Sequence, residues 1–260
     1  MKIFSHKGEL FNFIESEKNL GFIPTMGAIH LGHISLIKRS KKECHKTIVS
    51  IYVNKPQFNV KKDFTEYPRS LKKDIAILKK LKVDYLFTPL DKEIYPNGPN
   101  KKIKISSFQN KLCGKFRPGH FKAVVDVIDR FIKIINPKKI YFGNKDFQQL
   151  KIIEHFIKKN KIKTYVVGCK TIREKNGLAY SSRNNLFSKA EKKIGSKIYK
   201  LLLKSKKNII NNKISLSEIK KTIINFGARK IEYIKILNTN NLIKLHKKIK
   251  KKRIFISYYL

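Results

Sequence analysis

Two histidines stand three residues apart in the run Pro24 to His33, which reads Pro-Thr-Met-Gly-Ala-Ile-His-Leu-Gly-His. An apolar stretch, Leu20–Ile23, precedes this run, and an amphipathic stretch, Ile34–Arg39, follows it. The pattern predicts a buried strand, a glycine-containing turn and the first turn of a helix. A helix N-terminus offers free N–H groups and a partial positive charge, and imidazole adds a donor near neutral pH. These residue types indicate attack on, or departure of, a nucleotide phosphate.

A strand, a glycine turn and a helix occur together in many α/β proteins, so this motif needs support from elsewhere in the chain. Asn54 and Gln57 follow the apolar run Thr47–Val53, and their amides suit the hydroxyls and carboxylates of a small polar substrate. The alternative for this segment is turn chemistry, since Asn and Pro favour turns. Arg117 stands in Arg-Pro-Gly-His-Phe ahead of a helical pattern, and a capping loop is the favoured interpretation of this segment taken by itself.

Two later segments carry groups suited to polyphosphate. The first begins at Gly143 after an apolar run and provides the point charge of Lys145, with Gln149 a little further on. The second, residues 177–184, combines two serine hydroxyls with Arg183, and hydroxyls with guanidinium suit a triphosphate. An N-cap cluster would have a similar composition. No single segment decides the matter, but five such segments in one chain indicate nucleotide chemistry.

The net charge of +42 raises the possibility of nucleic-acid binding, and we discount it. Only 8 of the 60 basic residues are arginine, and the lysines are spread through nearly every segment. Specific readers of nucleic acid use arginine for bidentate contacts and aromatic side chains for stacking. The Lys-rich run 246–252 is expected to be a solvated loop or a helix end. We therefore expect only weak, salt-sensitive binding to polyanions.

Composition also restricts the class of protein. Hydrophobic residues make up 41% of 260 residues, enough for a sizeable core, and no apolar run approaches the ~20 residues of a membrane span. The N-terminal residues lack the features of a signal peptide. Three widely spaced cysteines fit neither a disulfide framework nor a zinc site. We expect a cytoplasmic protein without a membrane association.

The first two-thirds of the chain alternates short apolar runs with longer amphipathic stretches. This repeated βα pattern predicts an α/β fold with a doubly wound, Rossmann-like parallel sheet, followed by a smaller C-terminal α+β domain. The expected domains are 1–171 and 172–260. The expected strands are 20–24, 47–53, 85–88, 140–142, 164–168, 231–237 and 253–258. The expected helices are 34–43, 70–81, 121–135, 147–159, 188–206 and 215–226, the last with a capping box at Ser215.

Seven segments resemble those of the pantothenate synthetase (pantoate–β-alanine ligase) family, part of the H-x-G-H nucleotidyltransferase superfamily. They run colinearly from Gly21 to about Ser188 and read P-T-M-G-A-I-H-L-G-H, V-S-I-Y-V-N-K-P-Q-F, Y-P-R-S-L, E-I-Y-P-N-G, R-P-G-H-F, F-G-N-K-D-F-Q-Q-L and G-L-A-Y-S-S-R-N. The resemblance implies that ATP and (R)-pantoate form pantoyl adenylate and pyrophosphate with Mg²⁺. β-Alanine then attacks the adenylate to give pantothenate and AMP. Family members tend to be homodimers.

The resemblance also implies roles for individual residues. His33, as proton donor, with His30, Lys145 and Arg183 would carry catalysis, and Asp74 stands where the family places acidic residues near Mg²⁺. Asn54, Gln57, Arg117 and Gln149 would bind pantoate and β-alanine or support their site. The ATP site would comprise Pro24, Thr25, Met26, Gly27, Ala28, Ile29, His30, Leu31, Gly32, His33, Gly143, Asn144, Lys145, Asp146, Ile172, Tyr180, Ser181, Ser182 and Arg183.

The chain departs from the family pattern at several positions. Proline stands one residue later than usual beside Gln57, Asn144 replaces a usual Glu, and Ala123 stands where Gly is typical. Two other function classes remain as alternatives at this stage. The first element alone would allow a plain nucleotidylyltransferase acting on a phosphorylated partner, and the charge alone would allow an RNA-binding protein.

Overall fold

The structure, a computed structural model, describes residues 1–211, 213–239 and 252–260 and divides into two compact units. The first unit comprises Met1–Ile172 together with Tyr180–Arg183, and the second comprises Arg173–Ala179 and Asn184–Leu260. The boundary after Ile172 lies one residue from the expected one. The segment Tyr180–Arg183 belongs to the first unit. Sequence periodicity could not predict this, because the segment is distant in the chain from the residues it packs against.

The first unit is built on a six-stranded sheet in which every pairing is parallel, in the order β1-β4-β3-β2-β5-β6. This confirms the predicted α/β class. The strands are β1 (Lys2–Phe4), β2 (Leu20–Thr25), β3 (Lys46–Ile51), β4 (Tyr85–Phe87), β5 (Lys139–Gly143) and β6 (Tyr165–Cys169). The α-helices are α1 (Lys7–Ile14), α2 (Leu31–Glu43), α3 (Lys61–Thr65), α4 (Leu71–Lys80), α5 (Asp91–Ile94), α6 (Cys113–Phe116), α7 (His120–Ile135) and α8 (Phe147–Lys159). Short 3₁₀ turns are η1 (Lys55–Gln57), η2 (Ser107–Asn110), η3 (Asn144–Asp146) and η4 (Ser182–Leu186).

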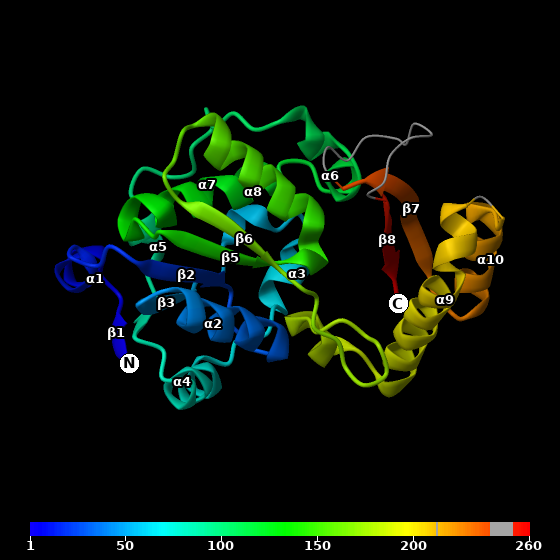
Figure 1. The fold of residues 1–260 in the computed structure, drawn as a ribbon, viewed down its shortest axis with the longest axis horizontal. Helices are drawn as coiled ribbons and strands as arrows, with labels where there is room; N and C mark the ends of the chain where they lie inside the picture. The colour runs from blue at the N-terminus through cyan, green and yellow to red at the C-terminus, as the bar shows by residue number, and fades with distance from the viewer. Residues whose placement is uncertain (212, 240–251) are drawn as a thin grey trace. The chain divides into compact units, whose positions relative to one another are not determined.

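Both faces of this sheet are buried, which explains why its strands are apolar without interruption. Phe22 packs in the cluster that contains α1, α7 and α8, with its ring centroid 5.5 Å from that of Phe131. The next residue, Ile23, points to the opposite face and packs in the cluster that contains α2 and α4. Figure 1 shows α7 and α8 on one side of the sheet and α2 and α4 on the other.

The strand order reverses at β2, which has β3 on one side and β5 on the other. Loops that leave the carboxyl ends of two such strands turn to opposite faces and leave a crevice where ligands bind in open α/β sheets. The loops at this switch point are the turn between β2 and α2 and the turn between β5 and α8. These are the segments that contain the two histidines and Lys145.

The second unit has a small antiparallel sheet and two helices, in agreement with the α+β prediction. Its elements are α9 (Lys189–Ile210), α10 (Leu216–Asn225), β7 (Lys230–Asn238) and β8 (Lys252–Tyr259). Isoleucines such as Ile198, Ile219 and Ile234 form its core. Both helices begin with a capping box, Ser188 with Glu191 and Ser215 with Glu218.

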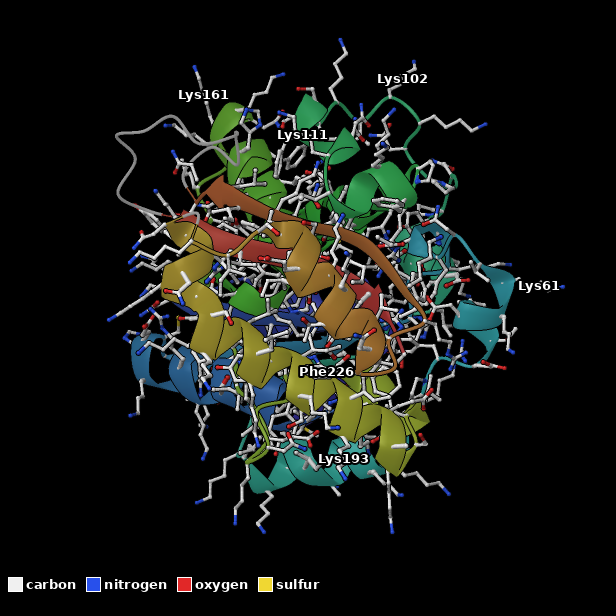
Figure 2. The ribbon with its side chains drawn as sticks, turned by 90° about the vertical axis from the view of Figure 1, so that its right-hand side faces the viewer. Lys61, Lys102, Lys111, Lys161, Lys193 and Phe226 are labelled. Atoms are coloured by element: carbon white, nitrogen blue, oxygen red, sulfur yellow. The ribbon has the colours of Figure 1, made fainter. Side chains whose placement is uncertain are left out.

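Some expectations from sequence need revision. Strand β1 and helices α1 and α3 were not predicted, because three, eight and five residues give too little periodicity to detect. The Lys-rich run 246–252 lies outside the described residues except for Lys252, which begins β8. Figure 2 shows long lysine side chains, among them Lys61 and Lys102, extending outward from separate segments. Among the described helices, none combines the length and apolarity that crossing a bilayer requires.

Candidate active site

The two histidines of the first motif lie at the N-terminus of α2 with their rings stacked. His30 is the N-cap residue, and its Nδ1 accepts a hydrogen bond from the Gly32 N–H at 3.1 Å. The ring centroids of His30 and His33 are 4.0 Å apart. A Cβ added at Gly32 would lie 2.7 Å from Cε1 of His30, so only glycine leaves room for this ring. The glycine of the H-x-G-H pattern therefore positions the first imidazole.

Both imidazoles are neutral at pH 7. Burial, followed by the positive charge of Lys145, lowers the pKa of His30 from 6.5 to about 4. Burial, followed by the neighbouring His30 and Lys145, lowers the pKa of His33 to about 3. Since Nδ1 of His30 accepts a hydrogen bond, its proton is on Nε2, which is free to donate. Nδ1 of His33 is buried and has no hydrogen-bond partner within the described residues.

The turn between β2 and α2 is held in an unusual conformation by a buried aspartate. Gly27 and Ala28 have positive φ angles of 82° and 48°. Asp74, on the first turn of α4 and 1% exposed, accepts the N–H of Ala28 at 2.9 Å and of Ile29 at 2.8 Å. Both carboxylate oxygens are thus committed to the backbone. This geometry favours a positioning role for Asp74 over the magnesium contact expected from sequence.

The segment Tyr180–Arg183 packs against this same turn although it lies about 150 residues away in the chain. The Ser182 hydroxyl lies 3.4 Å from the carbonyl oxygen of Gly27 and 3.3 Å from that of Ala28. The Tyr180 ring stacks on His30 with centroids 6.2 Å apart, and the Tyr180 N–H donates to the carbonyl of Ile172 at 3.1 Å. The structure therefore brings the serine-rich loop and the histidine pair together.

Arg183 is gripped by an aspartate that sequence reasoning missed. Its Nε and one terminal nitrogen donate to the two carboxylate oxygens of Asp63 on α3, each at 2.9 Å. The guanidinium also lies 5.2 Å from the Tyr67 ring. The only sequence signal for Asp63 is an acidic residue in a Lys-rich stretch, which identifies no partner. The bidentate pair holds Arg183 in one orientation beside the site.

The turn after β5 adds a cation next to the imidazoles. Lys145 lies near enough to His30 and His33 to depress both of their pKa values, and it pairs with Asp146 at 3.0 Å. The side chain of Asn144 packs against β6, because a Cβ added at Gly168 would lie 2.9 Å from its amide oxygen. This placement turns the Asn144 side chain toward the neighbouring strand.

A group of amide and guanidinium side chains surrounds Gln57 at the end of η1. Its Nε2 lies 3.3 Å from the sulfur of Met26, which ties it to the β2–α2 turn. Its backbone carbonyl accepts the Nδ1–H of His120 at 2.7 Å and a hydrogen bond from Arg117 at 3.4 Å. The one-residue shift of proline places Pro56 within η1, and Gln57 still reaches the site.

Of the other residues predicted to bind the acids, Asn54 forms a hydrogen bond with Gln57 in the described part of the chain, and Gln149 does not. Asn54 is 1% exposed and all its side-chain hydrogen bonds are internal, so it supports Gln57 and is not presented to a ligand. Gln149 lies half-buried on the first turn of α8, and within the described residues no hydrogen bond joins it to Gln57. Sequence reasoning did not include Tyr95 or His120 among the site residues, and both bond directly to this group.

The fold and site together define a class. A doubly wound parallel sheet presents neutral imidazoles, a lysine and a serine-arginine loop at its switch point, beside an amide group. This is the arrangement of a nucleotide-dependent α/β enzyme that handles a phosphate and a small acid.

Comparison with known proteins identifies the family. A family model for pantoate–β-alanine ligase matches residues 2–260. The chain is 38% identical to pantothenate synthetase from Sulfurihydrogenibium sp. (strain YO3AOP1), with 100% of this chain and 96% of that relative covered. It is 41% identical to the synthetase of Francisella philomiragia, covering 92% of this chain and 90% of the relative. The chain belongs to the pantoate–β-alanine ligase family.

Solved structures agree with this assignment. Pantothenate synthetase from Thermus thermophilus superposes with a TM-score of 0.90 at 31% identity, covering 99% of this chain and 95% of that one. The Francisella tularensis ligase, solved with β-γ ATP and β-alanine, superposes with a TM-score of 0.86 at 38% identity. That match covers 100% of this chain and 93% of the other.

Proposed function

We propose that this chain joins (R)-pantoate to β-alanine with ATP, through a pantoyl-adenylate intermediate, and releases pyrophosphate and AMP. The observation that carries the proposal is the packing of Ser182 on the β2–α2 turn beside His30 and His33. This contact brings the serine-arginine loop and the imidazole pair to one end of the sheet. Family membership supplies the identity of the substrates.

In the first step a carboxylate oxygen of pantoate attacks the α-phosphorus of ATP. The bond between that phosphorus and the bridging oxygen breaks, and pyrophosphate leaves with the electron pair. Negative charge grows on the leaving group, so the main task of the site is to stabilise that charge with pre-placed donors. Nε2–H of His30, the ring of His33 and the ammonium of Lys145 are the donors at the switch point.

Neutral imidazoles suit this task. Their pKa values of about 4 and about 3 keep them as uncharged donors at pH 7, and Lys145 supplies a positive charge that acts on both. An uncharged donor binds the developing anion without the cost of burying an additional positive charge. We assign to His33 a hydrogen bond to the leaving pyrophosphate. The proton-donor role that the family resemblance implies does not fit, because the neutral ring carries no additional proton to give. Arg183, oriented by Asp63, grips the triphosphate as a planar fork.

In the second step the amine of β-alanine attacks the acyl carbon, the C–O bond to AMP breaks, and AMP leaves. This step needs placement of the amine and exclusion of water more than charge stabilisation. Gln57, Gln149 and Arg117 are the residues that we assign to the two acids. Burial, followed by the positive charge of Arg183, lowers the pKa of Arg117.

Magnesium is expected to enter with the triphosphate. Within the described residues, no cluster of three or more His, Cys, Asp or Glu side chains is placed to hold a metal ion. The carboxylate of Asp74 bonds to backbone N–H groups, and that of Asp63 bonds to Arg183. These residues do not fit a site made of protein ligands alone, so we assign no step to the ion. Phosphate oxygens and water would form its coordination shell.

We further propose a cytoplasmic homodimer that acts on small molecules and binds no specific nucleic acid or membrane. The lysines extend from separate segments (Figure 2), which supports a charge that is dispersed and not gathered on one basic face.

A coupled assay of AMP release tests the proposed function. Purified protein with ATP, Mg²⁺, (R)-pantoate and β-alanine should release AMP, and omission of either acid should stop the release. Gln57→Ala should raise the KM for pantoate more than the KM for ATP. Pyrophosphate release that ignores pantoate and requires a phosphorylated substrate would establish the nucleotidylyltransferase alternative instead.

A further inference from the structure

The side chain of Gln57 stands at the end of a line of part-buried hydrogen bonds that begins at Tyr95. The Tyr95 hydroxyl donates to Oδ1 of Asn54 at 2.8 Å. Nδ2 of Asn54 donates to Oε1 of Gln57 at 3.1 Å and to the carbonyl of Ala123 at 3.3 Å. We call this line the Tyr95–Asn54–Gln57 relay. It joins the site to the segment after α5 and to helix α7.

The direction of every bond in the relay follows from the Ala123 carbonyl. A backbone carbonyl can only accept, so the NH₂ group of Asn54 must face it, and Oδ1 must face Tyr95. The second N–H of that NH₂ group needs an acceptor, and the only acceptor on the Gln57 amide is Oε1. Because Asn54 is 1% exposed, water does not offer an alternative partner. The Gln57 amide is therefore held with its NH₂ group turned away from Asn54.

That NH₂ group meets only a weak acceptor in the described residues. It lies 3.3 Å from the thioether sulfur of Met26, which is a poor hydrogen-bond acceptor. A carboxylate or hydroxyl oxygen of a bound acid would be a much better one. The backbone of Gln57 is fixed as well, by the hydrogen bonds that its carbonyl accepts from His120 and Arg117.

We propose that Tyr95 and Asn54 are positioning residues that fix the Gln57 amide so that it meets the substrate acid as a donor. This inference rests on the proposed function. Without the Tyr95 hydroxyl, Oδ1 of Asn54 is a buried acceptor with no partner, and only the Ala123 carbonyl still holds the Asn54 amide, so its hydrogen bond to Oε1 of Gln57 weakens. The Gln57 amide can then turn and present Oε1, whose lone pairs repel a carboxylate.

Tyr95→Phe tests the relay, and Tyr52→Phe is its matched control. Tyr52 is a neighbouring tyrosine, with its ring 6.4 Å from that of the partly buried Tyr95. Its hydroxyl donates to Asp91 at 2.9 Å and takes no part in the relay. Tyr95→Phe should raise the KM for pantoate about tenfold, which is the factor that the loss of one well-placed hydrogen bond to a charged group corresponds to. The KM for ATP and the melting temperature should match those of Tyr52→Phe.

Equal pantoate KM values in the two phenylalanine variants, or equal rises in the KM for pantoate and for ATP, would overturn the relay. Wild-type protein that shows no pantoate-dependent AMP release would instead refute the proposed function itself.

A second comparison tests the direction of the Gln57 amide. Gln57→Glu still accepts from Asn54 but offers the acid no donor, whereas Gln57→Leu offers neither donor nor charge. The relay predicts that Gln57→Glu binds pantoate more weakly than Gln57→Leu, because its carboxylate repels the acid. Tighter pantoate binding by Gln57→Glu would show that Gln57 acts as an acceptor and would contradict the proposal.

Discussion

Gly32 provides the sharpest separation between stability and activity in this protein. Replacing it with alanine would put a Cβ 2.7 Å from Cε1 and 2.8 Å from Nδ1 of His30. The backbone itself tolerates alanine, because Gly32 lies in the first turn of α2 and its φ angle is not positive. The imidazole is the end of a rotatable side chain, so it gives way at little cost to the fold. We therefore expect Gly32→Ala to fold normally and to lose the placement of His30.

The size of the effect follows from the contact distance. An ordinary contact needs the ring to retreat by about 1 Å from the new Cβ, and a misplacement of about 1 Å can cost about 100-fold in rate. That factor corresponds to about 2.7 kcal/mol in the activation free energy. The unfolding free energy should stay the same or rise by about 0.5–1 kcal/mol, because alanine is a better helix former than glycine.

Single-turnover formation of pyrophosphate from ATP and pantoate measures the first loss, and urea denaturation measures the second quantity. Gly8→Ala is the control, since Gly8 lies in α1 and an added Cβ there meets nothing within 4 Å. It should keep the wild-type rate. A Gly32→Ala variant with at least a third of the wild-type rate would refute the argument that the H-x-G-H glycine makes room for His30.

Three further predictions follow from buried or paired charges. Asp74→Asn should lower the unfolding free energy by about 2 kcal/mol, because an amide cannot accept both backbone N–H groups. The Mg²⁺ concentration for half-maximal rate should stay unchanged. A large rise in that concentration would show that Asp74 is a metal ligand. Burial lowers the pKa of His120 from 6.5 to about 4. Between these two pH values the folded protein keeps this imidazole neutral while the unfolded chain binds a proton on it, so stability falls as pH drops from 7 toward 4. His120→Asn should reduce this pH slope, by up to about 1.4 kcal/mol per pH unit, in urea melts, and an unchanged slope would count against it. Arg39, with Lys139 and Tyr141 as further partners, lowers the pKa of Glu43 to about 2. Glu43 therefore contributes stability that is present above pH ~4.5 and is lost as pH falls toward 2. Glu43→Gln should therefore cost about 1 kcal/mol at pH 7 and nothing near pH 2, as measured by thermal melts; a pH-independent difference would contradict that cause.

The sheet was predictable because strands that are buried on both faces have continuous apolar sequences. Helix α8 was predicted at its observed bounds, since its apolar residues repeat with helical spacing from Phe147 to Lys159. The three-residue strand β1 was not predictable, because only its pairing with β4 distinguishes it from an irregular end. Local pattern predicts an element when the element is long enough to show its period.

The site divides in the same way. The imidazole pair was visible because its glycines, histidines and helix start are contiguous. Asp63 was not, because its partner Arg183 lies 120 residues away and nothing local connects them. Asp74 was noticed as an acid, but its burial and its two backbone partners come only from the packing of α4 against the β2–α2 turn. Residues that position others leave little trace in the nearby sequence.

The central claim is that imidazoles, lysine and serine-arginine loop surround one triphosphate beside a site for a small acid. Exchange of labelled pyrophosphate into ATP tests it most directly, because exchange reports the first step alone. The account predicts exchange that requires (R)-pantoate, does not require β-alanine, and falls by orders of magnitude in His33→Ala while the fold is retained. Exchange that proceeds without pantoate, or at a near-normal rate in folded His33→Ala, would contradict it.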